Sequence, residues 1–426
     1  MLTRSVKNTL LILLFSLFVQ SSLFSQVRLA SPYSRYGIGD MSENNNSWNL
    51  ALGGTSIALK STSHVNYMNP ASYIAFDSSS FLFEGGFNID MVTLTSNLQT
   101  ANRNFASVGY LLFGIPITKW WHSSIGLIPY SKIGYNIASF SKVDQTNVAR
   151  IYNGSGGISR FYIGNAFKPV KNLSIGFNFS YLFGSMDRAS TVLFPDSVYY
   201  TNYKLDNSIV INDIFFDFGI QYTLKIKNDL KMTFGAIYSP ETKISAKTDL
   251  LARTFRLGGG GTEVYKDTIA IATGYKGNIV IPTMFGAGVS IEKTDNWLVG
   301  ADYRWQNWSK FSAFNLSDSL VNSFSLSAGV EYLPDVGSYS NFLKRVRYRF
   351  GFLYHSTYLE LYGKHLNEYA FSLGFGMPIK GKTALTLSAQ VGSRGTTELN
   401  LIRETYFRFT IGFSIYERMF VKRKYF

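Results

Sequence analysis

The sequence contains no cysteine and few charged residues. Without cysteine there are no disulfides, no thiolate metal site, no cysteine nucleophile and no lipidated N-terminal cysteine. Charged residues make up 16% of the chain, whereas about a quarter is typical of soluble proteins. Four histidines are present, and neither a serine–histidine arrangement nor paired acids of a protease type stand out. We therefore expect no enzyme, no catalytic residues, no metal site and no cofactor.

Long apolar runs are also missing after residue 26. No stretch of 18 or more apolar residues follows, which excludes a helical membrane protein. Residues 1–26 begin with Arg4 and Lys7, continue with an apolar run and end in small residues. This pattern predicts a secretory signal peptide. A membrane anchor is the alternative, but the apolar run is short for a membrane span.

The chain is basic, with a net charge of +14, but it lacks any clustered nucleic-acid motif. A basic chain suggests nucleic acid as a partner, yet no basic helix or recognisable binding motif is present. Basic residues at the rims of a membrane protein, next to phospholipid or lipopolysaccharide, explain the charge better. We expect no nucleic-acid partner and expect outer-membrane lipids, including lipopolysaccharide, as neighbours.

Aromatic residues are abundant, at 16% of the chain, and they alternate with polar residues. In "TYFRFTIGFSI", residues 405–415, Phe407 and Phe409 lie on one face of an extended chain and Arg408 on the other. The same alternation recurs along the chain, for example in "LSIGFNFSYLF" at 173–183. A period of two residues predicts β-strands.

The strands have the features of a transmembrane barrel rather than of a soluble sandwich. Many reach about 10 residues, which is the length that a tilted membrane-crossing strand needs. Aromatic residues gather at the ends of the apolar faces, as in an interfacial girdle. A charge on the lipid face costs roughly 2–4 kcal/mol near the bilayer midplane, so Arg408 must point inward. Open sheet edges cannot be satisfied in lipid, and the strands must therefore close.

The sequence predicts an all-β membrane protein, a 14-stranded antiparallel transmembrane β-barrel occupying residues 79–426. The expected strands are 79–93, 105–117, 124–136, 157–167, 172–186, 212–223, 230–240, 284–292, 297–305, 324–332, 346–355, 368–376, 383–392 and 405–416. We interpret 267–281 as part of a long loop hairpin. Long connections at 137–156, 187–211 and 241–283 alternate with short turns. Short turns face the periplasm in such barrels, which predicts an outer-membrane protein with both termini in the periplasm.

Residues 27–78 lack the alternation and precede the first strand. Such a segment either fills the lumen or lies in the periplasm. A barrel of 14 strands is wide enough to need filling or to conduct. We favour an N-terminal plug, or hatch, inside the barrel.

Charged residues of the strands are expected on the lumen side, where they have two possible roles. They could form a polar path or hold a carboxylate head group, or they could form an ion-pair network that fixes the plug. We favour the network, because a plugged barrel must satisfy such charges. The expected lumen-lining residues are Arg304, Arg347, Arg349, Arg408, Asp217, Asp302 and Glu331, together with Glu84 and Asp90.

Three stretches and the strand count carry a family resemblance: "LALGGTSIA" at 50–58, "NPAS" at 69–72 and "SSIGLIPYSKIGY" at 123–135. The chain resembles the fatty-acid transporter-like FadL/OmpP1 group of outer-membrane proteins, in the variety common in Bacteroidota. The resemblance implies a hatch and a path by which hydrophobic ligands enter from outside and leave sideways through a kinked third strand.

By this resemblance Asn69, Pro70 and Ala71 lie in the hatch, and Pro129 and Ser131 form a lateral gate on the third strand. Because proline removes a ladder donor, Pro129 marks either a gap in the wall or a plain bulge. The chain departs from the family in showing no well-defined apolar ligand site outside the barrel.

Two functions follow from these patterns. The first is a FadL-like channel for the uptake of hydrophobic small molecules. The alternative is a non-enzymatic structural subunit of a multi-protein outer-membrane complex, in protein secretion or in the barrel assembly machinery, because fold alone does not imply function. Co-purified lipid would favour the channel, and stoichiometric partner proteins would favour the subunit.

Overall fold

The computed structural model describes residues 31–41, 46–78, 80–143, 146–196, 200–338 and 340–418. The predicted signal peptide, residues 1–26, lies outside the described residues, as do the residues after 418. Within the described ranges, no helix has both the length and the apolar character needed to cross a membrane.

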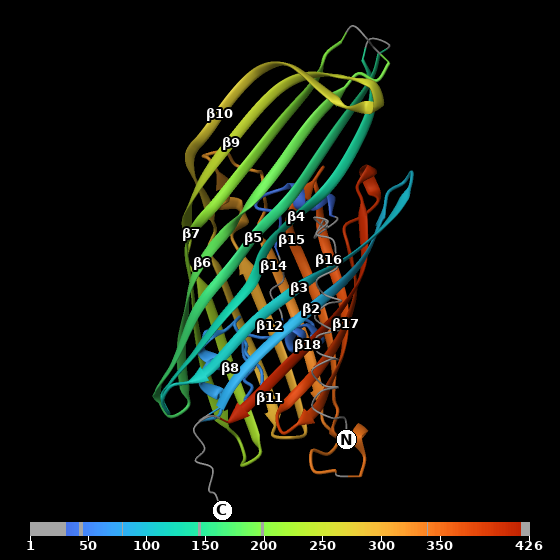
Figure 1. Cartoon of the computed structure of the whole chain (residues 1–426). Helices are drawn as coiled ribbons and strands as arrows, with labels where there is room; N and C mark the ends of the chain where they lie inside the picture. The colour runs from blue at the N-terminus through green and yellow to red at the C-terminus, as the bar shows by residue number, and fades with distance from the viewer. Residues whose placement is uncertain are drawn as a thin grey trace, which may run out of the picture.

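The described residues form a closed antiparallel barrel of 14 strands, as the alternation predicts. Its strands are β2 (Ser80–Thr95), β3 (Thr100–Pro116), β4 (Trp121–Val143), β5 (Thr146–Val170), β6 (Leu173–Leu193), β7 (Asn202–Lys225), β8 (Leu230–Ser239), β11 (Met284–Lys293), β12 (Trp297–Gln306), β14 (Ser323–Tyr332), β15 (Arg347–Leu361), β16 (Lys364–Lys380), β17 (Thr383–Arg394) and β18 (Arg403–Arg418). The last strand pairs with the first, Arg408 opposite Asp90, and this pairing closes the barrel (Figure 1).

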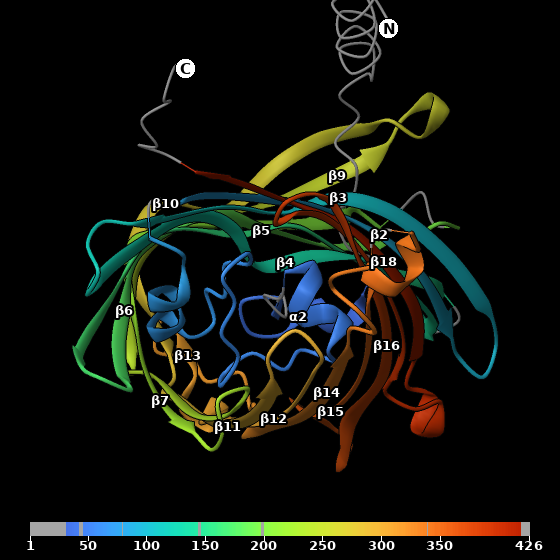
Figure 2. The ribbon, with the colours of Figure 1, turned by 90° about the horizontal axis from the view of Figure 1, so that it is seen from below.

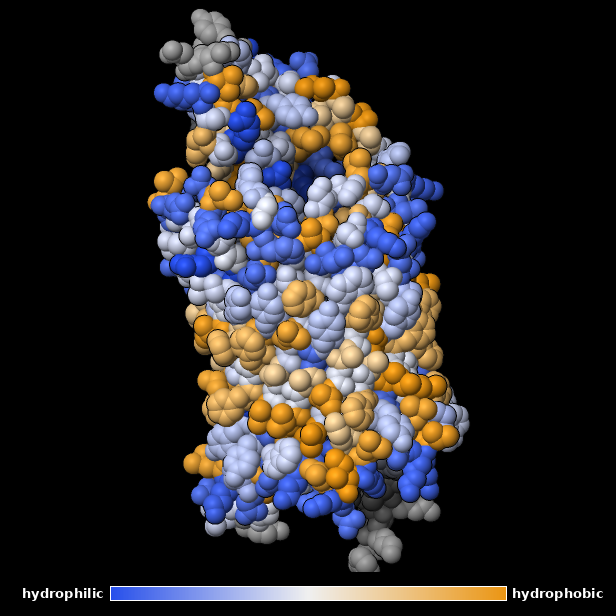
Figure 3. Space-filling model, turned by 180° about the vertical axis from the view of Figure 1, so that it is seen from behind, coloured by the Kyte–Doolittle hydropathy of each residue, from blue (hydrophilic) through white to orange (hydrophobic). Residues whose placement is uncertain are grey.

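The outer surface of the barrel carries the apolar side chains of the alternating pattern. On β7, Ile214, Phe216 and Phe218 are exposed, whereas Phe215 and Asp217 between them are buried. Figure 3 shows the result on one face of the molecule, as a largely apolar band across the barrel with a polar belt above it. An outward apolar band between polar zones is the lipid-facing surface of a transmembrane barrel.

A tall sheet rises from one side of the barrel, where the sequence predicted loops. The strands β4 to β7 continue far beyond the rim and are joined by β9 (Thr242–Leu257) and β10 (Glu263–Ile281) (Figure 1). The prediction of loops at 137–156 and 187–211 is therefore wrong, because these residues pair across β4, β5, β6 and β7. The prediction of a long loop at 241–283, with 267–281 as part of a loop hairpin, is wrong in the same way, because β9 and β10 pair there as two strands of the tall sheet.

The described part of the N-terminal segment, residues 31–41 and 46–78, lies inside the barrel (Figure 2). Its elements are η1 (Pro32–Arg35), β1 (Asp40–Met41), α2 (Ser47–Ala51) and η2 (Pro70–Ala75). Helix α2 contacts β15 to β18, and η2 contacts β4 to β7 on the other side of the lumen. The segment therefore touches opposite walls. The remaining short elements are η3 (Gly259–Gly261), η4 (Trp308–Lys310), β13 (Ser312–Ala313), η5 (Phe342–Arg345) and η6 (Glu398–Asn400).

Glycines on the inner face of the wall let the backbone of the segment approach closely. A Cβ at Gly351 would lie 1.9 Å from the amide nitrogen of Gly53, and one at Gly235 would lie 2.2 Å from the carbonyl oxygen of Ile57. No side chain fits at such distances, so only glycine allows the backbone of the segment to contact the wall at these two positions.

Candidate functional site

The N-terminal segment is anchored to the wall by a carboxylate that accepts two backbone hydrogen bonds. The amides of Ser56 and Ile57 donate to Oδ2 of Asp302, over 2.6 Å and 2.8 Å. All three residues are buried. Hydrogen bonds to a charged acceptor are among the stronger ones, so Asp302 fixes this turn of the segment against β12.

A second anchor is an ion-pair cluster around Glu331. Arg347 and Arg349 donate to its two carboxylate oxygens over 2.6 Å and 2.7 Å. The indole nitrogen of Trp48, on α2, donates to the same carboxylate over 3.2 Å. The cluster satisfies a buried charge and holds α2 at the same time.

The residues of the "NPAS" stretch also bind the wall. The side-chain amide of Asn69 donates to the carbonyl oxygens of Ile57, Ile220 and Ala236, over 2.7 Å, 3.3 Å and 3.4 Å. Pro70 and Ala71 lie next to Gly176 of β6, where a Cβ would come within 2.6 Å of their backbone. These residues join the segment to three neighbouring strands.

Lys60 links the N-terminal segment to hydroxyl groups of the wall. Its ammonium donates to the hydroxyl groups of Ser174 and Thr223, over 3.2 Å and 3.0 Å. Burial, together with the positive charge of Lys168, lowers the pKa of Lys60 to about 8. The charged form of Lys60 is thus disfavoured in the folded barrel.

A cavity of about 250 Å³ lies between the wall and the N-terminal segment, which lines it with Asp40 and Met41 of β1 and with Leu50, Tyr67 and Met68. Charged residues lie on both sides of the cavity. The charged side is lined by Asp90, Glu368, Arg394, Glu404 and Arg408. The other side combines the charged residues Arg160, Asp217 and Arg304 with the apolar side chains of Tyr130, Phe215, Ile237, Met284, Trp305, Trp308 and Leu359. The lining therefore offers apolar contacts next to paired charges.

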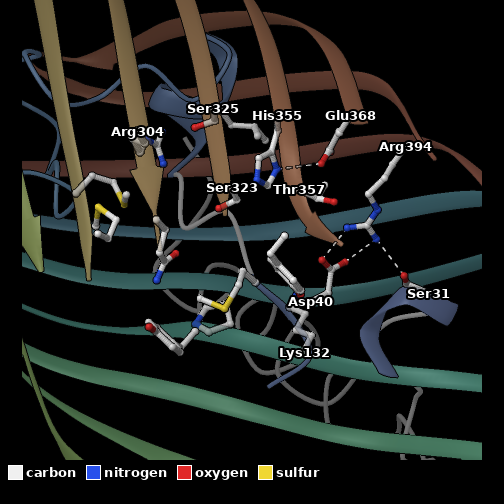
Figure 4. Close-up of a pocket in the computed structure, with 18 of the residues that line it drawn as sticks. Ser31, Asp40, Lys132, Arg304, Ser323, Ser325, His355, Thr357, Glu368 and Arg394 are labelled. Atoms are coloured by element: carbon white, nitrogen blue, oxygen red, sulfur yellow. Dashed lines mark hydrogen bonds and ion pairs between the residues drawn. The ribbon is translucent and has the colours of Figure 1, made fainter. Parts of the chain in front are cut away.

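The charged side of the cavity is internally paired. Arg394 donates to Asp40 over 2.7 Å and to Glu404 over 2.6 Å, and His355 lies 3.5 Å from Glu368 (Figure 4). Arg408 donates to Asp90 over 2.6 Å. Arg394 therefore links β1 of the segment to strands β17 and β18.

A gap in the wall opens next to the cavity, between the second and third strands of the barrel. The two strands pair only from Leu111 opposite Leu127 to Pro116 opposite His122. Above these pairs β3 and β4 diverge, as Figure 1 shows, and the β4–β5 register shifts between Pro129 and Ser131. Pro129 also lines the cavity. The irregular strand is the one on which the sequence placed the lateral gate.

The short strand β1 covers part of this gap from inside. Asp40 pairs with Lys132, and Met41 pairs with Ser131, on the edge of β4 that β3 has left. The ammonium of Lys132 donates to the hydroxyl of Ser107 of β3 over 3.3 Å. The segment thus supplies two residues of backbone pairing where the wall lacks a partner strand.

The predicted lumen-lining residues all belong to these contacts. Besides those already described, Arg304 donates to the carbonyl oxygen of Gly54 over 2.7 Å, and Asp217 accepts from Arg160 and from Ser239. Glu84 accepts from the amide of Val65 over 3.2 Å. The prediction missed Arg160, Arg394, Glu404 and Asp40. Arg160 follows the inward alternation and could have been found by it. Arg394 and Glu404 lie between the expected strands 383–392 and 405–416, and Asp40 lies in a segment whose residues show no alternation.

Among the described residues, no group of three or more histidines and acids could hold a metal ion.

A comparison with protein families matches residues 6–426 to the model of BamG. The chain belongs to the BamG family. The matching family is thus not the FadL/OmpP1 group that the sequence motifs suggested. A comparison with curated proteins finds no match.

Solved structures show that this member of the BamG family has a FadL-type barrel. The toluene transporter TbuX of Ralstonia pickettii is 15% identical, with a TM-score of 0.58 over 88% of this chain and 99% of the transporter. The toluene transporter TodX of Pseudomonas putida is 16% identical, with a TM-score of 0.58 over 90% of this chain and 100% of the transporter. A FadL homologue of Pseudomonas aeruginosa is 12% identical, with a TM-score of 0.57 over 89% and 99%. At such identities the likeness concerns the fold.

Proposed function

We propose that the protein is an outer-membrane channel for the uptake of hydrophobic small molecules. The observation that carries the proposal is the gap between β3 and β4, because it adjoins a partly apolar cavity and, within the described residues, the edge of β4 is paired there by Asp40 and Met41 of β1. A cavity of about 150 Å³ is enough for benzene, so this cavity has room for a compound with one aromatic ring. Two of the similar structures are toluene transporters.

The proposed route runs from the tall sheet into the cavity and sideways through the gap into the lipid. Residues 27–78 act as the hatch, which also contributes β1 to the cavity lining, so the ligand does not cross the whole lumen. Pro129 and Ser131 form the lateral gate, since Pro129 has no N–H to pair with a neighbouring strand.

The short turns and both termini face the periplasm, and lipids, including lipopolysaccharide, surround the wall. The proposed role involves no catalysis, no cofactor and no nucleic acid, and we propose the Bacteroidota variety of this architecture.

A disulfide between β1 and β4 tests the route. Met41 and Ser131 are paired across antiparallel strands, where Cα atoms are about 4.5–5.5 Å apart, which suits a disulfide. The chain has no native cysteine, so the double variant Met41→Cys/Ser131→Cys introduces the sole pair. Oxidation should lower the uptake of radiolabelled toluene at least tenfold, and reduction should restore it.

A matched control places the disulfide across β17 and β18 with Ser388→Cys/Thr410→Cys, which are also paired in the inner wall. This bond should leave uptake unchanged. Equal uptake by oxidised and reduced Met41→Cys/Ser131→Cys would contradict a route past β1.

A second candidate function is that of a structural subunit of an outer-membrane complex. The family match favours it, because the matching family is BamG and not the FadL/OmpP1 group of transporters. Purification in mild detergent separates the two candidates. Partner proteins at stoichiometric yield, together with unchanged toluene uptake in cells lacking the protein, would support the subunit and contradict the channel.

A further inference from the structure

Strand β10 forms a free edge of the tall sheet. It pairs with β9 along one side, and on its other side only Ile279 and Val280 pair, with β13. Residues 263–277 therefore have no strand on that side among the described residues. A free edge presents a row of unpaired backbone N–H and C=O groups, which proteins usually cover or protect.

The middle of this edge is apolar, although the β9–β10 register shifts three times between Tyr265 and Tyr275. The six residues 268–273, "TIAIAT", contain no charge, proline or glycine. The side chains of Ile269 and Ile271 are 60% and 67% exposed. Short uncharged segments of high β-propensity are the ones that pair with other chains when an edge exposes them.

The hairpin that carries this edge is basic. Residues 242–281 contain six basic and three acidic side chains, a net charge of +3 that comes from β9, since β10 carries two side chains of each sign. Lys247 and Lys276 lie opposite each other in the β9–β10 pairing, and no ion pair of the described residues includes either of them. Directly opposed like charges are unfavourable, so an acidic neighbour would stabilise the hairpin.

We propose that the edge of β10 binds an extended, acidic segment of a second protein, which adds a strand to the tall sheet. The unpaired backbone groups call for a peptide, since a lipid chain offers them no hydrogen bonds. The net charge of +3 disfavours a second copy of the same hairpin and favours an acidic partner. The proposal goes beyond ligand uptake and does not depend on it.

The experiment places a photoreactive amino acid at Ile271 of the full-length protein in its own outer membrane. The other edge of the same sheet provides the matched position, Phe140 of β4, which is 78% exposed. After irradiation, the adducts are mapped by mass spectrometry to the residues of the captured chain. A second variant adds Ile269→Lys to the probe at position 271, and its control adds Phe140→Lys instead.

The expected result is an adduct from the probe at position 271 that maps to an acidic segment of one protein. The probe at position 140 should give at most one fifth of that adduct yield. Ile269→Lys should reduce this adduct at least fivefold, and Phe140→Lys should leave it unchanged. A heat-modifiable gel shift verifies that each variant is a folded barrel. Adducts to a second copy of the chain, to lipopolysaccharide or to nothing would each overturn the proposal, as would equal yields at the two positions.

Discussion

Replacing Asp302 with alanine should loosen the N-terminal segment inside an intact barrel. The change removes the single oxygen that accepts from the amides of Ser56 and Ile57, over 2.6 Å and 2.8 Å. Both amides are buried, and a buried donor without an acceptor costs about 1–3 kcal/mol. Two such donors cost roughly 2–6 kcal/mol, and each 1.4 kcal/mol is a factor of ten. A water molecule in the space left by the carboxylate would accept from these amides and bring the cost towards the lower end of this range, roughly 2 kcal/mol.

Hydrogen exchange followed by mass spectrometry measures this cost locally, because exchange reports the free energy of opening of each region. We expect the protection of the peptide covering residues 55–58 to fall at least 30-fold, while the protection of β14 and β15 is retained. Asp302→Asn is the matched control, since it keeps one carbonyl oxygen and should lower the protection by about tenfold or less. Unchanged protection in Asp302→Ala would show that packing alone holds the segment, and the reasoning about this anchor would be wrong.

Three further predictions concern the segment and its contacts. Gly351→Val should displace the segment and raise the conductance in planar bilayers, because a Cβ would lie 1.9 Å from the amide nitrogen of Gly53, whereas Gly259→Val, at an open hairpin tip, should not. Arg394→Met should speed maleimide labelling of a Met41→Cys thiol at least tenfold by releasing Asp40, whereas Arg253→Met, at a more exposed ion pair, should not change it. The lowered pKa of Lys60, about 8, means that its charge opposes folding below pH 8 and that this effect fades as the pH rises towards 10.5. We measure the urea midpoint of unfolding of Lys60→Met minus that of the unaltered protein. This difference should be largest below pH 8 and should decrease between pH 8 and 10.5. A difference that does not change with pH would contradict the lowered pKa of Lys60.

The barrel itself was predictable because each of its strands faces lipid on one side and the lumen on the other. This contrast gives a period of two residues, and it placed Arg408 inward, where it donates to Asp90. The tall sheet was not predictable in the same way. Nearly every residue of β10 is exposed, so its two faces do not differ and no period marks it as a strand.

The path of the N-terminal segment could not be derived from its own residues. Its contacts join positions far apart in the chain, such as Trp48 with Glu331 and Ser56 with Asp302. The sequence of the wall strands does contain one indication of this path, namely glycines at inward-facing positions. Inward glycines such as Gly351 mark places where another backbone approaches, and a strand facing only water in a wide lumen would not need them.

The tall sheet has two edges, and their surroundings separate the two proposed roles. The β4 edge adjoins the cavity and receives β1 at Ser131 and Lys132, whereas the β10 edge is separated from it by β5, β6, β7 and β9. Four intervening strands at about 4.8 Å spacing put roughly 24 Å between the edges, and substitutions so far apart act independently as a rule. A disulfide that locks β1 should therefore stop uptake without changing the adduct at position 271, and Ile269→Lys should do the reverse. If one change affected both readouts, uptake and partner binding would have to be coupled through the sheet that connects them.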